Sequence, residues 1–137
     1  MSIGIGAFAK KAAEDTNTVI YEYGGYNLND PRYWNKERLC DGAIIIQRDC
    51  FVEPEIHEKT KRLPSGRKKI VVKRIPVPVE YGKMLKDGRI VVDNSSNCWR
   101  TTDDELKVDV IACRLLHYIF LRYQDEGEIP ELVSYNV

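Results

Sequence analysis

Two histidines and four cysteines are the side chains of this sequence best suited to nucleophilic or metal chemistry. A catalytic pair would need Cys98 as the nucleophile beside His57 or His117 as the base. A zinc site would draw on the same three residues together with Cys113, but these come from four scattered places, whereas structural zinc usually has closely paired ligands. We therefore predict no metal site. We expect Cys98 to pack beside Trp99, and His117 to be a hydrogen-bonded histidine of the core.

Acidic side chains offer a second kind of chemistry, because carboxylates bind divalent ions. Glu53, Glu55 and Glu58 are close enough in sequence to be such ligands, but a helix over residues 54–63 explains them by the helix dipole and by i,i+4 ion pairs. The sequence contains no phosphate-binding loop, no dinucleotide-binding glycine motif, no serine-hydrolase elbow and no His-Glu-x-x-His. We predict no catalytic residue and no cofactor. An enzyme of unfamiliar type stays an open alternative.

Basic residues dominate the middle of the chain. Residues 59–74 contain no acidic side chain, so a patch around the turn at residues 64–66 could bind phosphates or an acidic protein surface. The alternative is a solvated surface whose like charges prevent strand edges from pairing. We select Arg67, Lys68 and Lys69 as candidate partner-binding residues. The basic residues of this stretch are Lys59, Lys61, Arg62, Arg67, Lys68, Lys69, Lys73 and Arg74.

Five aromatic residues follow one another closely in the first quarter of the chain. Tyrosine and tryptophan combine a large apolar area with a polar group, which is why protein interfaces use them as anchors. Tyr21 and Tyr23 lie on the same face of a predicted strand, and either of them is a candidate for the core. We select Tyr26, Tyr33 and Trp34 as candidate partner-binding residues.

The overall charge excludes a strong general attraction to nucleic acid or to an anionic membrane, because 21 basic and 21 acidic side chains cancel. No apolar stretch is long enough to cross a bilayer, and the N-terminal residues lack the apolar centre of a signal peptide. We expect a cytoplasmic protein with reduced cysteines and no membrane partner. After Thr102 the chain is acidic, and this region could attract a basic partner or pair internally with residues 59–74.

The residues at the two ends of two segments predict that each segment forms a helix. In residues 54–63, Pro54 suits the first helical position, Glu55 lies at the positive end and the basic residues lie at the negative end. In residues 103–125, Thr102 and Glu105 form a capping box, and Gly127 with Pro130 supplies the stop. The full set of predicted helices covers residues 4–15, 31–39, 54–63, 79–86 and 103–125, and the predicted strands cover residues 18–23, 43–51, 67–79 and 89–93.

These elements predict a single α+β domain over residues 1–137, with a sheet of about four mainly antiparallel strands. The long C-terminal helix would pack on one face of the sheet, with shorter helices around it. Because charged and aromatic residues occur without a catalytic motif, we predict a small non-catalytic protein-binding module of the inhibitor, immunity or adaptor type, whose partner is another protein. The alternative is a nucleic-acid-associated protein that uses the basic patch at residues 59–74. The sequence leaves the oligomeric state open.

Overall fold

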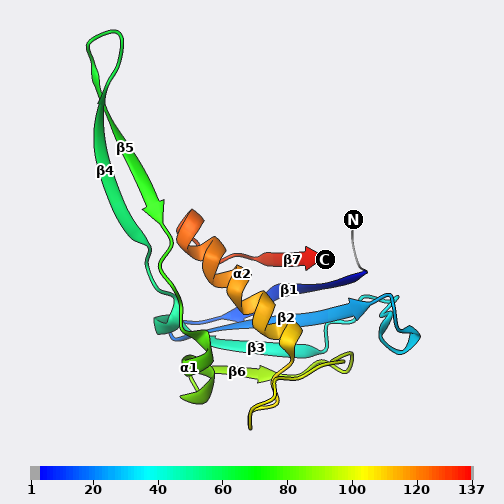
Figure 1. The fold of residues 1–137 in the computed structure, drawn as a ribbon. Coiled ribbons are helices and arrows are strands. Elements are labelled where there is room, and N and C mark those ends of the chain that lie inside the picture. Colours follow the sequence, from blue (N-terminus) through cyan, green and yellow to red (C-terminus); the bar gives the residue numbers. More distant parts are fainter. Residues whose placement is uncertain (1–3, 137) are drawn as a thin grey trace.

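The computed structural model describes residues 4–136, which form a five-stranded antiparallel sheet, a separate two-stranded hairpin and one long helix (Figure 1). The sheet has the strand order β6-β3-β2-β1-β7, and helix α2 crosses one of its faces. The predicted α+β class and long C-terminal helix are confirmed, but the sheet has five strands rather than about four. The elements are β1 (Ile5–Glu14), β2 (Thr18–Asn27), η1 (Pro31–Tyr33), β3 (Gly42–Gln47), η2 (Arg48–Cys50), β4 (Glu55–Arg62), β5 (Lys68–Ile75), α1 (Tyr81–Lys86), β6 (Ile90–Asp93), α2 (Val110–Glu126) and β7 (Leu132–Asn136).

The core lies between α2 and one face of the sheet. Alternate residues of β2 and β3 point toward the helix, and Tyr21, Tyr23, Ile44 and Ile46 are fully buried there. The two buried hydroxyls are hydrogen-bonded, since Tyr21 donates to the Pro130 carbonyl and Tyr23 donates to a carboxylate. Both tyrosines are therefore structural.

The N-terminal segment is a strand, so the predicted helix over residues 4–15 is wrong. β1 lies inside the sheet, paired with β2 on one side and with β7 on the other. Its alternation buries Ala7 and Ala9 on the helix side, and these small residues leave room for α2. Alanine favours a helix over most other residue types by only about 0.5 kcal/mol per residue. The hydrogen bonds of the two ladders outweigh this preference. Strand β7 (Leu132–Asn136) is not among the predicted elements.

Helix α2 begins later than predicted. Asp109, not Thr102, is the N-cap, and its carboxylate accepts a hydrogen bond from the Ile111 amide. Thr102 instead donates to the Asp104 carboxylate in a loop before the helix. The predicted stop is confirmed, because the chain leaves the helix at Gly127 with a φ of 78°.

Residues 54–63 do not form the predicted helix. They contain β4, which pairs over its whole length with β5 across the turn at residues 63–67. Charge placement at helix ends and i,i+4 pairs are worth only about 0.2–1 kcal/mol each, so an eight-residue ladder overrides them. The resulting hairpin, residues 55–75, projects away from the sheet and α2 (Figure 1). We call it the arm.

The shorter predicted elements are confirmed in part. Asp30 caps a helical turn that begins at Pro31, but this 3-10 turn ends at Tyr33 instead of continuing to residue 39. The helix predicted at residues 79–86 is α1, and the strand predicted at 89–93 is β6. Pro76 and Pro78 follow β5 rather than lying within it, so they join the arm to α1. Within residues 4–136, no helix is long and apolar enough to span a membrane.

Candidate interaction surface: the basic hairpin arm

The arm consists of β4, β5 and their turn. Every residue of β4 is exposed, and in β5 only Val71 and Ile75 are half-buried. A two-stranded hairpin is marginally stable in water, because it has no second layer against which to bury side chains. Most of the surface of the arm is therefore exposed to solvent.

The register of the ladder divides the arm into two faces, because side chains directly opposite each other point to the same side. The apolar face carries Ile56, Ile70 and Val72, which are 55%, 64% and 55% exposed. It is completed by Glu58, Thr60, Arg62, Lys68 and Arg74. The lysine face carries His57, Lys59, Lys61, Lys69 and Lys73, together with Glu55, Val71 and Ile75. The arm is thus amphipathic although it is exposed on both sides.

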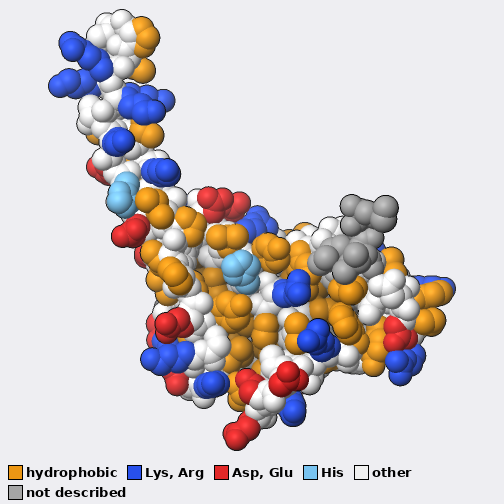
Figure 2. Space-filling model, in the orientation of Figure 1, with side chains coloured by type: hydrophobic (Ala, Val, Ile, Leu, Met, Phe, Trp, Pro, Cys, Tyr) orange, Lys and Arg blue, Asp and Glu red, His pale blue; other side chains and the backbone are white. Residues whose placement is uncertain are grey.

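Charge is strongly separated between the arm and the rest of the chain. The arm contains eight of the 21 basic and two of the 21 acidic side chains, so its net charge is +6 and that of the remaining residues is −6. In the space-filling view, Lys and Arg side chains gather along the outer part of the arm (Figure 2). Among residues 4–136, none of the eight basic side chains forms a salt bridge. Internal pairing with the acidic C-terminal region, one of the two possibilities left open by the sequence, does not occur in the structure.

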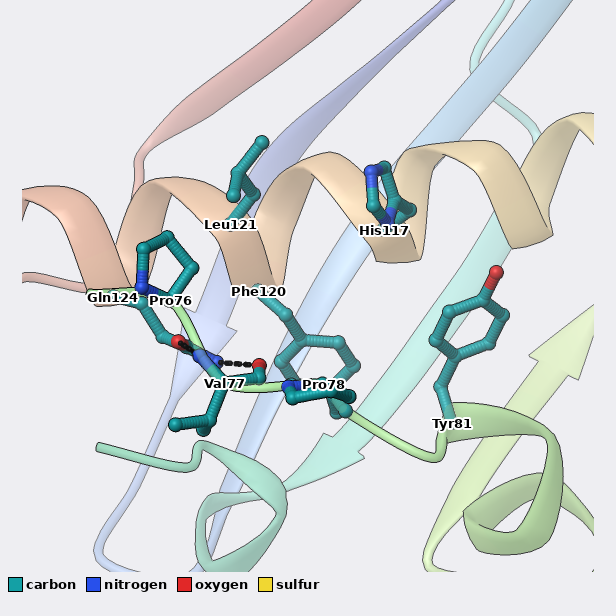
Figure 3. A pocket seen from close by; sticks show the side chains of 9 residues that line it. Pro76, Val77, Pro78, Tyr81, His117, Phe120, Leu121 and Gln124 are labelled. Atoms are coloured by element: carbon teal, nitrogen blue, oxygen red, sulfur yellow. Dashed lines mark hydrogen bonds between the residues drawn. The ribbon is translucent and has the colours of Figure 1, made fainter. Parts of the chain in front are cut away.

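The root of the arm is held by one buried side chain of α2. Gln124 is 2% exposed, and its amide accepts a hydrogen bond from the Val77 N–H (2.7 Å) and donates one to the Val77 carbonyl (3.0 Å) (Figure 3). Arg74 donates to the backbone carbonyl of Gln124 at 3.3 Å. Gln124 thus satisfies both backbone groups of a residue that has no strand neighbour. Gln124 is not among the residues predicted from sequence, although a lone amide on the apolar face of a helix is a signal for such a role.

A shallow groove with a volume of about 230 Å³ lies beside this root, between α2 and the segment that joins the arm to α1 (Figure 3). Pro76, Pro78, Phe120 and Leu121 give it mainly apolar walls. His117 lines the groove and is exposed, so the predicted core histidine is wrong. The α2 face that carries His117 is directed to the groove because Leu116 and Ile119 occupy the sheet side.

The sequence-predicted site residues lie at two separate ends of the molecule. Arg67, Lys68 and Lys69 are on the outer part of the arm, whereas Tyr26 and the loop after β2 are at the far end of the sheet (Figure 1). The structure therefore does not bring the aromatic and basic candidates together.

Each aromatic candidate lies against a cation of its own loop. The Arg38 guanidinium is 4.7 Å from the Tyr26 ring centre, and Lys36 Nζ is 4.9 Å from that of Trp34. The Tyr33 ring is 5.4 Å from the guanidinium of Arg32. Tyr26 and Tyr33 are half-buried, and Trp34 is 37% exposed. These contacts use the ring faces for local packing, which reduces the area free for a partner.

The half-buried Cys98 lies beside the buried carboxylate of Asp109. Burial, with the Asp109 charge as a second cause, raises the pKa of the Cys98 thiol to about 11. The thiol is therefore protonated at neutral pH, and a protonated thiol is a poor nucleophile. No group of three or more His, Cys, Asp or Glu side chains that could hold a metal ion is found within residues 4–136.

A buried polar network holds the loop between β6 and α2. Besides capping α2, Asp109 accepts a hydrogen bond from the Tyr23 hydroxyl at 2.9 Å, and that hydroxyl accepts one from the Ser95 N–H. Ser95 Oγ donates to the Asp41 carboxylate at 2.6 Å. Burial raises the pKa of Asp109, whereas the hydrogen bonds from Ser95 and then Ser96 lower the pKa of Asp41. All four groups are used in positioning the backbone, so the network is structural.

Comparison of the chain with protein-family models, with curated proteins and with solved structures finds no match.

Proposed function

We propose that residues 1–137 form a single-domain, non-catalytic protein-binding module whose arm makes the contact with a partner protein. The observation that carries this proposal is the apolar face of the arm, where three β-branched side chains are more than half exposed. Full burial of one such side chain stabilises a complex by about 1.5–3 kcal/mol. Because each of the three is already partly buried, covering its exposed part would contribute roughly half of that free energy. Exposed apolar area of this kind on a charged projection is typical of a binding surface.

The position of the arm supports an adaptor type more than an inhibitor or immunity type, because an adaptor must reach a partner beyond its own body. Tyr26, Tyr33 and Trp34 form a proposed second contact surface at the far end of the sheet. The four cysteines, one buried and three half-buried, form no disulfide. Free thiols agree with a reducing, cytoplasmic location. The raised pKa of Cys98, the candidate nucleophile, keeps its thiol protonated at neutral pH and supports a non-catalytic role.

Nucleic-acid binding is the second candidate function, and the lysine face favours it. Lys59, Lys61, Lys69 and Lys73 point to one side of a two-stranded ribbon, and such a ribbon fits the major groove of DNA. Two observations weigh against it. The apolar face would stay unused, and the net charge of −6 outside the arm would repel phosphates.

A photo-crosslinking amino acid placed on either face of the arm tests the proposal. The probe replaces Ile70 on the apolar face in one variant and Lys69 on the lysine face in its matched control, and both are expressed in the source cells. We expect protein adducts from the probe at position 70 and few from the probe at position 69. Nucleic-acid adducts at position 69, with no protein adduct at either position, would refute the protein-binding module and support the second candidate.

A further inference from the structure

Within residues 4–136, no second layer of structure covers the face of the sheet opposite α2 (Figure 1). Its central row consists of Ile20, Ile45 and Val91, which lie side by side on β2, β3 and β6. Ile20 and Ile45 are half-buried and Val91 is 48% exposed. The intervening residues of the same strands point into the core, so this row is the solvent side of the sheet. We call this row, together with the charged row next to it, the open face.

The row beside it is charged. Asp93, Ala43, Glu22 and Lys10 lie side by side across β6, β3, β2 and β1, which gives two acidic side chains and one basic one. Beyond Glu22, the other end of β2 is covered by the loop that follows it, because the Leu39 backbone packs directly on Gly24. The loop therefore leaves the Ile20 row and the charged row uncovered.

The arm carries a surface that complements the open face. Its apolar face presents Ile70 and Val72 together with Arg62 and Lys68, while the open face presents β-branched residues beside Glu22 and Asp93. Across the whole chain the arm is +6 and the remainder is −6, so an arm and a second body attract each other. Two twisted sheets that pack through β-branched faces form an ordinary two-layer core.

In the structure, the arm cannot contact the open face of its own sheet. Its root is tied to α2 through Gln124, and α2 covers the opposite face of the sheet. The arm then projects away from the body (Figure 1). The arm can therefore meet such an open face only on a second copy of the chain.

We propose that the arm of one copy packs its apolar face on the open face of a second copy. This inference rests on the proposed protein-binding function and names the partner. Because the arm and the open face are different surfaces, the contact is heterologous, so it joins copies into a ring or chain, or into a dimer that exchanges arms. The oligomer should weaken as salt is added, since opposite charges contribute to the contact.

Two charge-reversed variants provide the test, with the purified full chain studied by sedimentation velocity after nuclease treatment. The arm variant carries Arg62→Glu and Lys68→Glu, and the body variant carries Glu22→Lys and Asp93→Lys. We expect the wild type to associate in a concentration-dependent way and each variant alone to be monomeric. An equimolar mixture of the two variants should associate again, because the acidic arm of one meets the basic open face of the other. A mixture that stays monomeric, or a wild type that is monomeric at every concentration and salt, would overturn the inference.

A matched pair of substitutions tests the apolar contribution to the proposed contact between the arm and the open face. Val72→Lys removes an apolar side chain from the apolar face, whereas Val71→Lys makes the same change on the lysine face of the same strand. Association should weaken at least about tenfold in the first, equivalent to about 1.4 kcal/mol, and much less in the second. Equal losses would contradict the assigned face, and circular dichroism confirms that both variants fold.

The outcome also separates the two proposals. A monomeric chain that still crosslinks to a different protein through position 70 would refute the second copy and leave the protein-binding function standing. No self-association and no protein adduct would refute both.

Discussion

The side-chain amide of Gln124 pairs with both backbone groups of Val77, and so joins helix α2 to the root of the arm. The amide makes the two hydrogen bonds that a neighbouring strand would otherwise make. Val77 needs them because it follows β5 and lies outside the β4–β5 ladder. The direction in which the arm projects therefore depends on one buried polar residue of the helix.

Replacing Gln124 with Ala should destabilise the protein by about 1–3 kcal/mol, because the N–H and the carbonyl of Val77 both lose the side-chain amide that pairs with them. Urea unfolding followed by circular dichroism measures this change. Gln47→Ala is the control, since Gln47 is exposed on β3 and should change the free energy of unfolding by less than about 0.5 kcal/mol. Equal effects of the two substitutions would contradict the role of Gln124.

The carboxyls of Asp109 and Asp41 should give opposite pH dependences. The pKa of Asp109 is raised in the folded state, so the folded protein keeps the proton longer than the unfolded chain as the pH rises above 3.8. The stability of the wild type relative to Asp109→Asn should fall as the pH rises through that window. The pKa of Asp41 is lowered, so the stability of the wild type relative to Asp41→Asn should fall as the pH drops below 3.8.

Urea unfolding of the wild type and the two asparagine variants, measured over a pH series, gives both differences. Each variant serves as the control for the other, because the remaining titrating groups are shared. Two differences of the same sign would contradict the proposed environments of these carboxyls.

Gly24 should not tolerate a side chain. A Cβ at this position would overlap the backbone carbonyl of Leu39, which is packed on the sheet by its loop. Gly24→Ala should therefore displace the loop over residues 28–41 and destabilise the protein by about 1–3 kcal/mol, the usual range for overpacking. Thermal unfolding measures the destabilisation, and the change in tryptophan fluorescence, to which Trp34 in this loop and Trp99 both contribute, reports the displacement of the loop.

Gly82 is the matched control for Gly24. It lies in α1, and a Cβ there would meet no atom within 4 Å. Gly82→Ala should be neutral or stabilise the protein by up to about 1 kcal/mol, because alanine favours a helix. A loss at position 82 as large as the loss at position 24 would show that the Leu39 contact is not the cause.

The arm should unfold without the body. Gly66 in the arm turn has a φ of 86° and no neighbour within 4 Å, so Gly66→Ala introduces only backbone strain, about 1–2 kcal/mol. We expect weaker cross-strand NOEs between β4 and β5 and an unchanged midpoint of global unfolding. Gly66→Asn, which tolerates this backbone conformation better, should preserve the NOEs. A large shift of the global midpoint would show that the arm and body fold as one cooperative unit.

Some elements are determined by local sequence. The β-branched run of β3, the alternating Tyr21 and Tyr23, the Asp30-Pro31 cap and the stop at Gly127 all lie where their residue types predict. In each case the deciding interaction is within a few residues, or the burial pattern repeats with the period of the strand. The basic patch was also recognised from composition, as were Arg67, Lys68 and Lys69 within it.

Other features depend on contacts between distant segments, which no local pattern contains. Residues 4–15 form an internal strand because β2 and β7 pair with them, and residues 54–63 form β4 because β5 lies opposite. The division of the arm into an apolar and a lysine face follows from that register, which the predicted helix over residues 54–63 does not contain. The tertiary structure likewise decided that Gln124 holds the arm, that Asp109 begins α2, and that the basic charge extends into solvent away from the acidic residues. Side-chain types thus determined the chemistry available, and long-range pairing determined where that chemistry is presented.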